Sequence, residues 1–153
     1  MILIRHAQAP YAERWIRMRH ELWPEANVDE LRREVEAFFD GRAVHLWAVL
    51  FAIDQEAGAL LGFAELNIRP YAEGCQSNRI AFLEGWYVTP AQRHRGIGAA
   101  LVKAAERWAL SVGCTEFASD TQADNALGRT AHLGVGFEEI EVIRCFRKPL
   151  SGT

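Results

Sequence analysis

Apolar and polar residues recur with helical spacing in two stretches near the start of the chain. Between Pro10 and Pro24 the apolar residues return every three or four positions, which predicts a helix with one buried face. The same spacing between a capping Asp29 and a terminating Gly41 predicts a second helix. The apolar residues of the two stripes are Trp15, Met18, Leu22, Leu31, Val35, Phe38 and Phe39.

The pattern changes to strands in the middle of the chain. Residues 44–53 form an almost continuous apolar run, residues 54–58 are typical of a turn, and residues 60–69 alternate, so we expect a hairpin. A third strand is expected at residues 79–88, where Glu84 interrupts a series of large apolar residues.

Helical spacing returns in the last third of the chain and is followed by shorter elements. A long helix is expected at residues 96–112, with Gly113 as its C-terminal cap. A short strand at 116–119, a short helix at 124–133 and a final strand at 137–146 complete the prediction.

The order of these elements indicates the fold class. Two helices, a hairpin and a strand, followed by a long helix, a strand, a helix and a strand, predict an α/β (α+β) fold with a mixed sheet and helices on both faces. The central strand, helix and strand should form a parallel, right-handed unit. With 153 residues, the chain has the length of one domain, and we expect residues 1–153 to form it.

Charge and apolar content exclude several classes of partner. The chain carries 17 Lys and Arg against 20 Asp and Glu, a net charge of −3, which argues against a nucleic-acid partner. The longest apolar run, at residues 43–53, is too short to cross a membrane, and no secretory signal is visible, so we expect a cytoplasmic protein without a membrane partner. The three cysteines and five histidines lack metal-site spacing, so we expect no metal and reduced, largely structural thiols.

The stretch between the third strand and the long helix is the most informative for chemistry. Gly96 and Gly98 open the helix, so a ligand can approach the backbone, and the unpaired N–H groups of a helix start bind anions. Residues 91–110 carry four basic side chains and one acidic one, a net +3 in an acidic chain. The loop therefore predicts a phosphate site, and the alternative is an ordinary helix start with solvated arginines.

A set of motifs resembles the GNAT acyltransferase superfamily: Val88-x-Pro90, Arg93-x-x-Gly96-x-Gly98, Asn125 and Gly136-Phe137. The resemblance implies a mainly antiparallel sheet with one splayed parallel strand pair, and acetyl-CoA as cosubstrate. It also implies that the pyrophosphate lies on the loop and that the pantetheine arm pairs with the strand before it. The implied cofactor contacts are Trp86, Tyr87, Val88, Arg93, His94, Arg95, Gly96, Ile97, Gly98 and Asn125.

Further motifs are similar to those of aminoglycoside 6′-N-acetyltransferases. They are Leu22-Trp23-Pro24, Tyr71-x-x-x-Cys75, Phe82-Leu83-Glu84-Gly85, Ala118-Ser119-Asp120-Thr121 and Gly136-Phe137-Glu138-Glu139. This resemblance implies a cationic aminoglycoside substrate, a role in antibiotic resistance and a homodimer. The implied substrate contacts are Trp23, Tyr71, Glu84, Asp120 and Glu141. Some relatives have a histidine three positions after the tryptophan, where this chain has Ala26.

Each carboxylate of this set also has a purely structural reading. Glu84 lies in an apolar strand, so it should face a cavity or have a partner, such as a structural ion pair. Asp120 follows a strand at the carboxyl edge, where open sheets bind ligands, or else caps a turn. Glu141 alternates with apolar neighbours on the final strand and either contacts substrate or faces water.

The aromatic residues and His132 have structural readings as well. Trp23 and Tyr71 stand next to prolines, where their rings either stack on a sugar or a cation or pack in the core. His132 lies seven residues after Asn125, where many members of the superfamily have a tyrosine near the thiol, or else it faces solvent.

These assignments predict direct acetyl transfer from acetyl-CoA to a primary amine. Glu84 would accept the amine proton, directly or through water. A backbone N–H of Tyr87 or Val88 would polarise the thioester carbonyl, and His132 would protonate the departing thiolate. Two alternatives stay open: the same reaction on a polyamine or a protein N-terminus, and a CoA-binding or drug-binding module without turnover.

Overall fold

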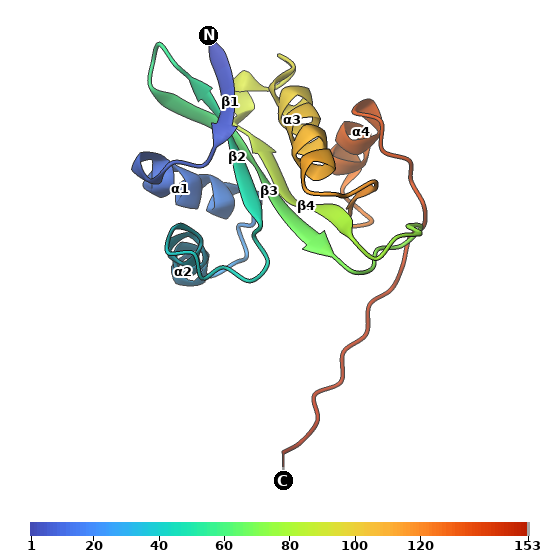
Figure 1. Ribbon diagram of the computed structural model, residues 1–153. Coiled ribbons are helices and arrows are strands. Elements are labelled where there is room, and N and C mark those ends of the chain that lie inside the picture. Colours follow the sequence, from blue (N-terminus) through green and yellow to red (C-terminus); the bar gives the residue numbers. More distant parts are fainter. Residues whose placement is uncertain (153) are drawn as a thin grey trace. The chain divides into compact units, whose positions relative to one another are not determined.

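A five-stranded sheet with the strand order β1-β2-β3-β4-β5 organises the computed structural model, which describes residues 1–152 (Figure 1). The first four strands pair antiparallel and β5 pairs parallel with β4, as expected for a mixed, mainly antiparallel sheet. The strands are β1 (Ile2–His6), β2 (Ala48–Asp54), β3 (Ala59–Arg69), β4 (Ile80–Val88) and β5 (Phe117–Ser119).

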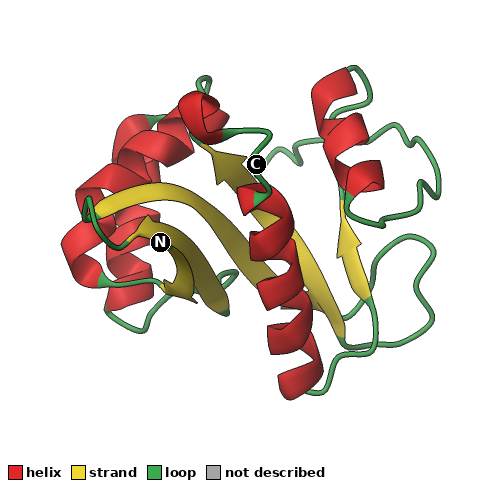
Figure 2. Cartoon of the chain, turned by 90° about the horizontal axis from the view of Figure 1, so that it is seen from above, coloured by secondary structure: helices red, strands yellow, loops and turns green. Residues whose placement is uncertain are grey.

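Helices cover both faces of this sheet (Figure 2). Helices α1 (Ala12–Leu22) and α2 (Val28–Phe39) lie on one face, and α3 (Ile97–Ser111) packs against the other. Residues 1–120 form one compact unit that contains the whole sheet, and a second unit begins at Thr121 and contains α4 (Ala126–Gly134).

The core lies on both sides of β3. Trp15 of α1 is fully buried and meets the rings of Phe38, Phe39 and Phe51 edge to face. The alternation at residues 60–69 predicts one buried face, but residues 60–67 are all buried because α1 and α3 cover opposite sides of the strand. A central strand with two covered faces requires apolar or paired side chains at every position.

Several boundaries near the N-terminus differ from the sequence prediction. Strand β1 was not predicted, because five residues at a partly exposed edge carry little periodicity. Pro10 lies in a separate 3-10 turn before α1. Helix α2 is capped by Asn27, whose Oδ1 accepts hydrogen bonds from the N–H groups of Asp29 and Glu30, and not by Asp29 as predicted. The cap therefore moves the helix start to Val28.

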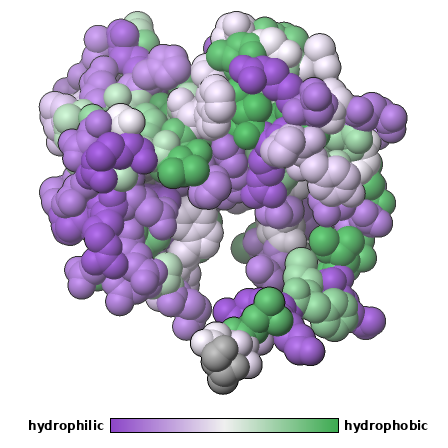
Figure 3. All heavy atoms as spheres, turned by 60° about the horizontal axis from the view of Figure 1, so that its bottom comes forward, coloured by the Kyte–Doolittle hydropathy of each residue, from purple (hydrophilic) through white to green (hydrophobic). Residues whose placement is uncertain are grey.

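The final strand predicted at residues 137–146 is wrong for the described chain. Residues 137–152 form neither helix nor strand, and the Phe146 side chain is 92% exposed. Figure 3 shows hydrophobic residues standing among hydrophilic ones on the surface near the last residues. Alternation alone does not make a strand, since its backbone must find a pairing partner. Cys114 is buried and Cys75 packs against a core cluster, as expected for structural thiols, whereas Cys145 is exposed.

Candidate active site

The loop before α3 has the geometry of an anion site. Residues 93–96 are exposed, and the backbone takes left-handed conformations at His94 (φ 63°) and Gly96 (φ 80°). Gly96 is the N-cap, so no side chain caps the helix, and the first intrahelical bond runs from Ala100 N to Gly96 O. The amides of residues 97–99 therefore lie at the start of a 15-residue helix without an intrahelical acceptor.

Two side chains fasten this loop to β4. The Arg93 Nε donates to Val88 O at 2.8 Å, and the Arg93 guanidinium lies 5.3 Å from the centre of the Tyr87 ring. The Trp86 indole N–H donates to Gly98 O at 3.2 Å, and a Cβ at position 98 would stand 3.2 Å from Cζ2 of that indole. Arg93 and Trp86 thus set the position of the loop, and the exposed residues His94, Arg95 and Gly96 form its outer rim.

Strands β4 and β5 separate after three residue pairs. Ala81, Phe82 and Leu83 lie opposite residues 117–119, whereas β4 continues to Val88. Thr89 N donates to Leu61 O on the β3 side, so the N–H and C=O of the preceding Val88 point to the opposite side by strand alternation. Of the two predicted carbonyl-polarising amides, those of Tyr87 and Val88, the Val88 amide is the one that faces away from β3.

Glu84 stands at a bulge where the parallel pairing ends. Gly85 lies opposite Glu65 and Leu83 lies opposite Leu66, so Glu84 is the extra residue of β4. Its Oε2 accepts hydrogen bonds from Asn67 Nδ2 at 2.8 Å and Arg69 Nε at 3.0 Å. Its Oε1 accepts one from a terminal nitrogen of Arg69 at 2.7 Å.

Glu84 therefore has the kind of partner that we expected from the sequence, an ion pair with Arg69. The Glu84 side chain is 21% exposed, so the ion pair with Arg69 lies at the surface of the sheet and not deep within it. The Arg69 guanidinium also lies 3.5 Å from the centre of the Phe82 ring. Arg69 is thus the cation that the Glu84 carboxylate and the Phe82 ring hold between them.

The other predicted substrate contacts of the first unit occupy different positions. Trp23 caps the C-terminus of α1 and is partly exposed, with its indole against Gly85. Tyr71 is 68% exposed on the loop after β3, so it is not a core residue. Asp120 is exposed and follows Ser119, which pairs with Leu83, so Asp120 and Glu84 each come directly after the last pair of the two strands.

Tyr87 makes a contact that the sequence did not predict. Its hydroxyl donates a hydrogen bond to a carboxylate oxygen of Glu21 on α1. Burial of the phenol and the nearby Glu21 carboxylate raise the pKa of Tyr87 to about 12. Tyr87 therefore stays neutral at physiological pH and ties α1 to β4 beside the loop.

Three predicted site residues belong to the second unit. Asn125 caps α4, with Oδ1 accepting from Gly128 N and Nδ2 donating to Thr121 Oγ1, both at 2.9 Å. His132 is partly buried, and its Nδ1 lies 2.7 Å from Gly128 O, which places the proton on Nδ1. Glu141 is exposed in the segment that forms no strand, so its predicted place in a final strand is wrong.

Sequence reasoning missed the residues that hold the site residues in place. They are Arg19, Glu21, Glu65, Asn67, Arg69 and Gly85. Glu65 interrupts an apolar strand just as Glu84 does, so the same reasoning would have marked it as a residue that needs a partner.

The described residues contain no group of three or more His, Cys, Asp or Glu side chains arranged to hold a metal ion. None of the helices within residues 1–152 is both long enough and apolar enough to cross a membrane.

Comparison with known proteins identifies the family. The model of the acetyltransferase (GNAT) family matches residues 15–137. An aminoglycoside N(6′)-acetyltransferase type 1 of Klebsiella aerogenes is 52% identical over 148 residues, which cover 97% of each chain. A relative of the same name from Stenotrophomonas maltophilia is 38% identical, with 96% of this chain and 93% of that protein covered.

A solved structure agrees with this assignment. The structure of AAC(6′)-Iy in complex with the bisubstrate analogue CoA-S-monomethyl-acetylneamine superposes with a TM-score of 0.88 at 36% identity, covering 98% of this chain and 99% of that one. The separated parallel strands, the bulge at Glu84 and the uncapped start of α3 thus occur within a fold shared along almost the whole chain. The chain belongs to the acetyltransferase (GNAT) family.

Proposed function

We propose that this protein transfers the acetyl group of acetyl-CoA to the 6′-amino group of aminoglycosides. The observation that carries the proposal is the position of Glu84, a carboxylate on the bulge where β4 and β5 part. It lies on the strand that leads directly into the anion-binding loop. The names of the similar proteins, and the CoA and aminoglycoside parts of the analogue bound by AAC(6′)-Iy, support the same pair of substrates.

The loop at residues 93–98 suits the diphosphate of acetyl-CoA. The amides of residues 97–99 and the exposed Arg95 supply donors and positive charge, and no side chain covers Gly96. The open side of β4, which includes the Val88 N–H, can bond an extended arm that carries amides as a further strand would. We assign Trp86, Tyr87, Val88 and Asn125 to the cofactor side of the site.

Glu84 would accept the amine proton. A primary alkylammonium is protonated at neutral pH and must lose a proton before its nitrogen can attack a carbonyl. Oε1 of Glu84 accepts one hydrogen bond and Oε2 accepts two, so Oε1 keeps the larger capacity for a proton, directly or through water.

The transfer itself needs little more than alignment. A C–N bond forms at the acetyl carbon and the C–S bond breaks, while the Val88 N–H stabilises the charge on the carbonyl oxygen. As the amide forms, its nitrogen loses a second proton; His132 Nε2 would take up a proton and pass it to the thiolate, while Nδ1 stays bonded to Gly128 O. No acyl-enzyme is required in this sequence of steps.

The carboxylates orient the polycationic substrate. Glu84 and Asp120 each follow the last residue pair of the parallel β4–β5 pairing, and Trp23 and Tyr71 offer partly or largely exposed rings to a sugar or an ammonium. We assign Glu141 to the same role from the second unit. A pair of opposite charges about 4 Å apart is worth about 4 kcal/mol at intermediate dielectric, before desolvation is subtracted.

We further propose that both units serve one acetyltransferase domain, because the family match at residues 15–137 runs through the boundary at Thr121. The exposed apolar side chains of residues 140–150 support a homodimer, which sedimentation velocity at several concentrations tests. An acetyl-CoA-dependent enzyme would act in the cytoplasm, where it would confer antibiotic resistance.

Release of free CoA thiol with different amines tests the function. The purified protein is supplied with acetyl-CoA and with kanamycin, spermidine or an N-terminal peptide in turn. We expect thiol release and a 6′-acetylated product with kanamycin. Thiol release with spermidine or the peptide alone would assign the chemistry to another amine, and kanamycin binding without thiol release would make the protein a sequestering module.

A further inference from the structure

The Trp23 indole lies against the backbone of the β4 bulge. Trp23 follows the last residue of α1, and its backbone N–H donates to the backbone oxygen of Arg19 at 2.8 Å. A Cβ added at Gly85 would stand 2.8 Å from Cη2 and 3.1 Å from Cζ2 of the indole. The first of these distances is shorter than real Cβ contacts allow, so the ring keeps this place only because residue 85 is glycine.

A buried ion pair lies on the same face of the sheet. The Arg19 Nε donates to Glu65 Oε2 at 2.8 Å, and a terminal nitrogen of Arg19 donates to Oε1 at 3.0 Å. Trp15 Nε1 donates to the same carboxylate at 2.9 Å. Arg19 is 2% exposed and Glu65 is 1% exposed.

The remaining donors of Arg19 connect the pair to α2. One terminal nitrogen donates to Leu31 O at 3.0 Å, and the other also donates to Glu34 Oε2 at 2.8 Å. The guanidinium is thus held from β3 and from α2 at once. Replacing a buried ion pair with apolar residues of similar volume is often neutral or stabilising, so the presence of the pair is weak evidence of a role in stability.

The ion pair contacts the indole through Arg19, and it is linked to the backbone beneath the indole through Glu65. The Arg19 guanidinium carbon lies 5.2 Å from the centre of the Trp23 ring, within the range of cation–π interaction. Gly85, on which the ring rests, is the cross-strand partner of Glu65. The indole is therefore held between a fixed guanidinium and a bare stretch of backbone, next to Glu84.

We propose that Arg19, Glu65 and Gly85 are positioning residues that hold the Trp23 indole beside Glu84 as a wall for the aminoglycoside. The inference rests on the proposed function and extends it to residues that do not touch the substrate. The ring is fixed from both sides, so moving either support should weaken the binding of the aminoglycoside without affecting the binding of acetyl-CoA.

Gly85→Ala tests one support, with kanamycin and acetyl-CoA as the probes. The new methyl displaces the indole, and we expect the KM for kanamycin to rise about 2- to 30-fold, the range of one aromatic contact to a cation. The KM for acetyl-CoA and the kcat should stay at the wild-type values. An unchanged kanamycin KM would overturn the proposal. So would a general loss, in which kcat falls and the KM values for kanamycin and acetyl-CoA rise together.

The double variant Gly85→Ala/Trp23→Phe distinguishes positioning from general damage. Phenylalanine lacks the outer ring that the methyl would meet, so Gly85→Ala should add little to the effect of Trp23→Phe. If the rise in kanamycin KM of the double variant equals the product of the rises of the two single variants, Gly85 acts independently of Trp23 and the proposal is overturned.

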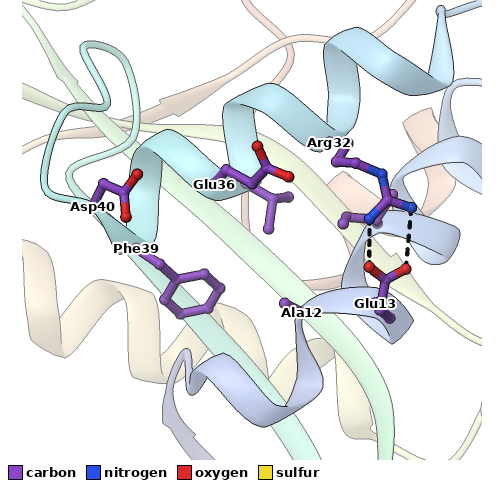
Figure 4. A pocket seen from close by; sticks show the side chains of 8 residues that line it. Ala12, Glu13, Arg32, Glu36, Phe39 and Asp40 are labelled. Carbon is purple, nitrogen blue, oxygen red and sulfur yellow. Dashed lines mark hydrogen bonds and ion pairs between the residues drawn. The ribbon is translucent and has the colours of Figure 1, made fainter.

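Arg19→Lys tests the other support. Lysine keeps the charge and loses the planar, two-pronged contact, so the kanamycin KM should again rise selectively. The matched control is Arg32→Gln, which removes the exposed Arg32–Glu13 ion pair between the same two helices (Figure 4) and should leave all constants unchanged. If the wild-type protein releases no thiol with kanamycin, the proposed function is overturned together with this inference. If the wild type is active and Gly85→Ala has the same kanamycin KM, only the positioning role of Gly85 is overturned.

Discussion

Tyr87→Phe should change how the stability of the protein depends on alkaline pH. The Tyr87 side chain is 7% exposed, and its hydroxyl donates to the Glu21 carboxylate. Burial of the phenol is the main cause that raises its pKa from an ordinary 10.0 to about 12, and the Glu21 carboxylate adds to it. Ionisation would place a phenolate on a largely buried ring next to the Glu21 carboxylate.

The size of the effect follows from the two pKa values. Because the folded-state pKa is the higher one, the stabilisation is complete below pH 10 and is lost as the pH rises through 12. A shift of about two units corresponds to about 2.7 kcal/mol in the free energy of unfolding. Between about pH 8 and about pH 11 roughly half of this, about 1.4 kcal/mol, should disappear.

Urea unfolding of wild type and Tyr87→Phe at those two pH values measures the effect. Other tyrosines and lysines titrate in both proteins, so the comparison isolates Tyr87. Wild type should lose about 1.4 kcal/mol more than the variant over the interval. Equal losses in the two proteins would refute the reasoning, since they would mean that Tyr87 has the same pKa in the folded and unfolded chains.

Three further substitutions have defined outcomes. Glu84→Gln should lower kcat for kanamycin by about 10²- to 10⁴-fold and remove the acidic limb of the pH–rate profile, and a profile like that of wild type would exclude Glu84 as the base. Trp86→Phe removes the hydrogen bond to Gly98 O and should raise the KM for acetyl-CoA by about 2- to 10-fold, while an altered kanamycin KM instead would contradict its place on the cofactor side. Asn27→Ala removes the cap of α2 and should cost about 1 kcal/mol in thermal unfolding, with no loss expected if the cap were Asp29.

The regular elements follow from local pattern, which is why most of them could be predicted. The stripes of α1 and α2 and the apolar runs of the central strands depend on residues close in sequence. The failure at residues 137–146 depends on a distant partner. Residues 137–146 alternate as a strand should, but strand formation also requires a neighbouring backbone, which alternation cannot specify.

In the candidate site as well, the need for a partner could be predicted from the sequence, but the identity of the partner could not. The need of Glu84 for a partner follows from the cost of burying a carboxylate, and Arg69 fulfils it 15 positions away. The identity of that partner depends on the register of β3 against β4, which includes a bulge. Arg19 and Glu65 lie 46 positions apart, and only the packing of α1 on the sheet brings them together.

The amide resonances of the loop offer the most direct test of the central claim, which is that the uncapped start of α3 binds the diphosphate of acetyl-CoA. CoA is titrated into isotope-labelled protein, and the backbone N–H signals are followed by NMR. The account predicts that the amides of Ile97, Gly98 and Ala99 shift most, because they are the donors at the helix start. CoA binding that leaves these three signals in place would contradict it.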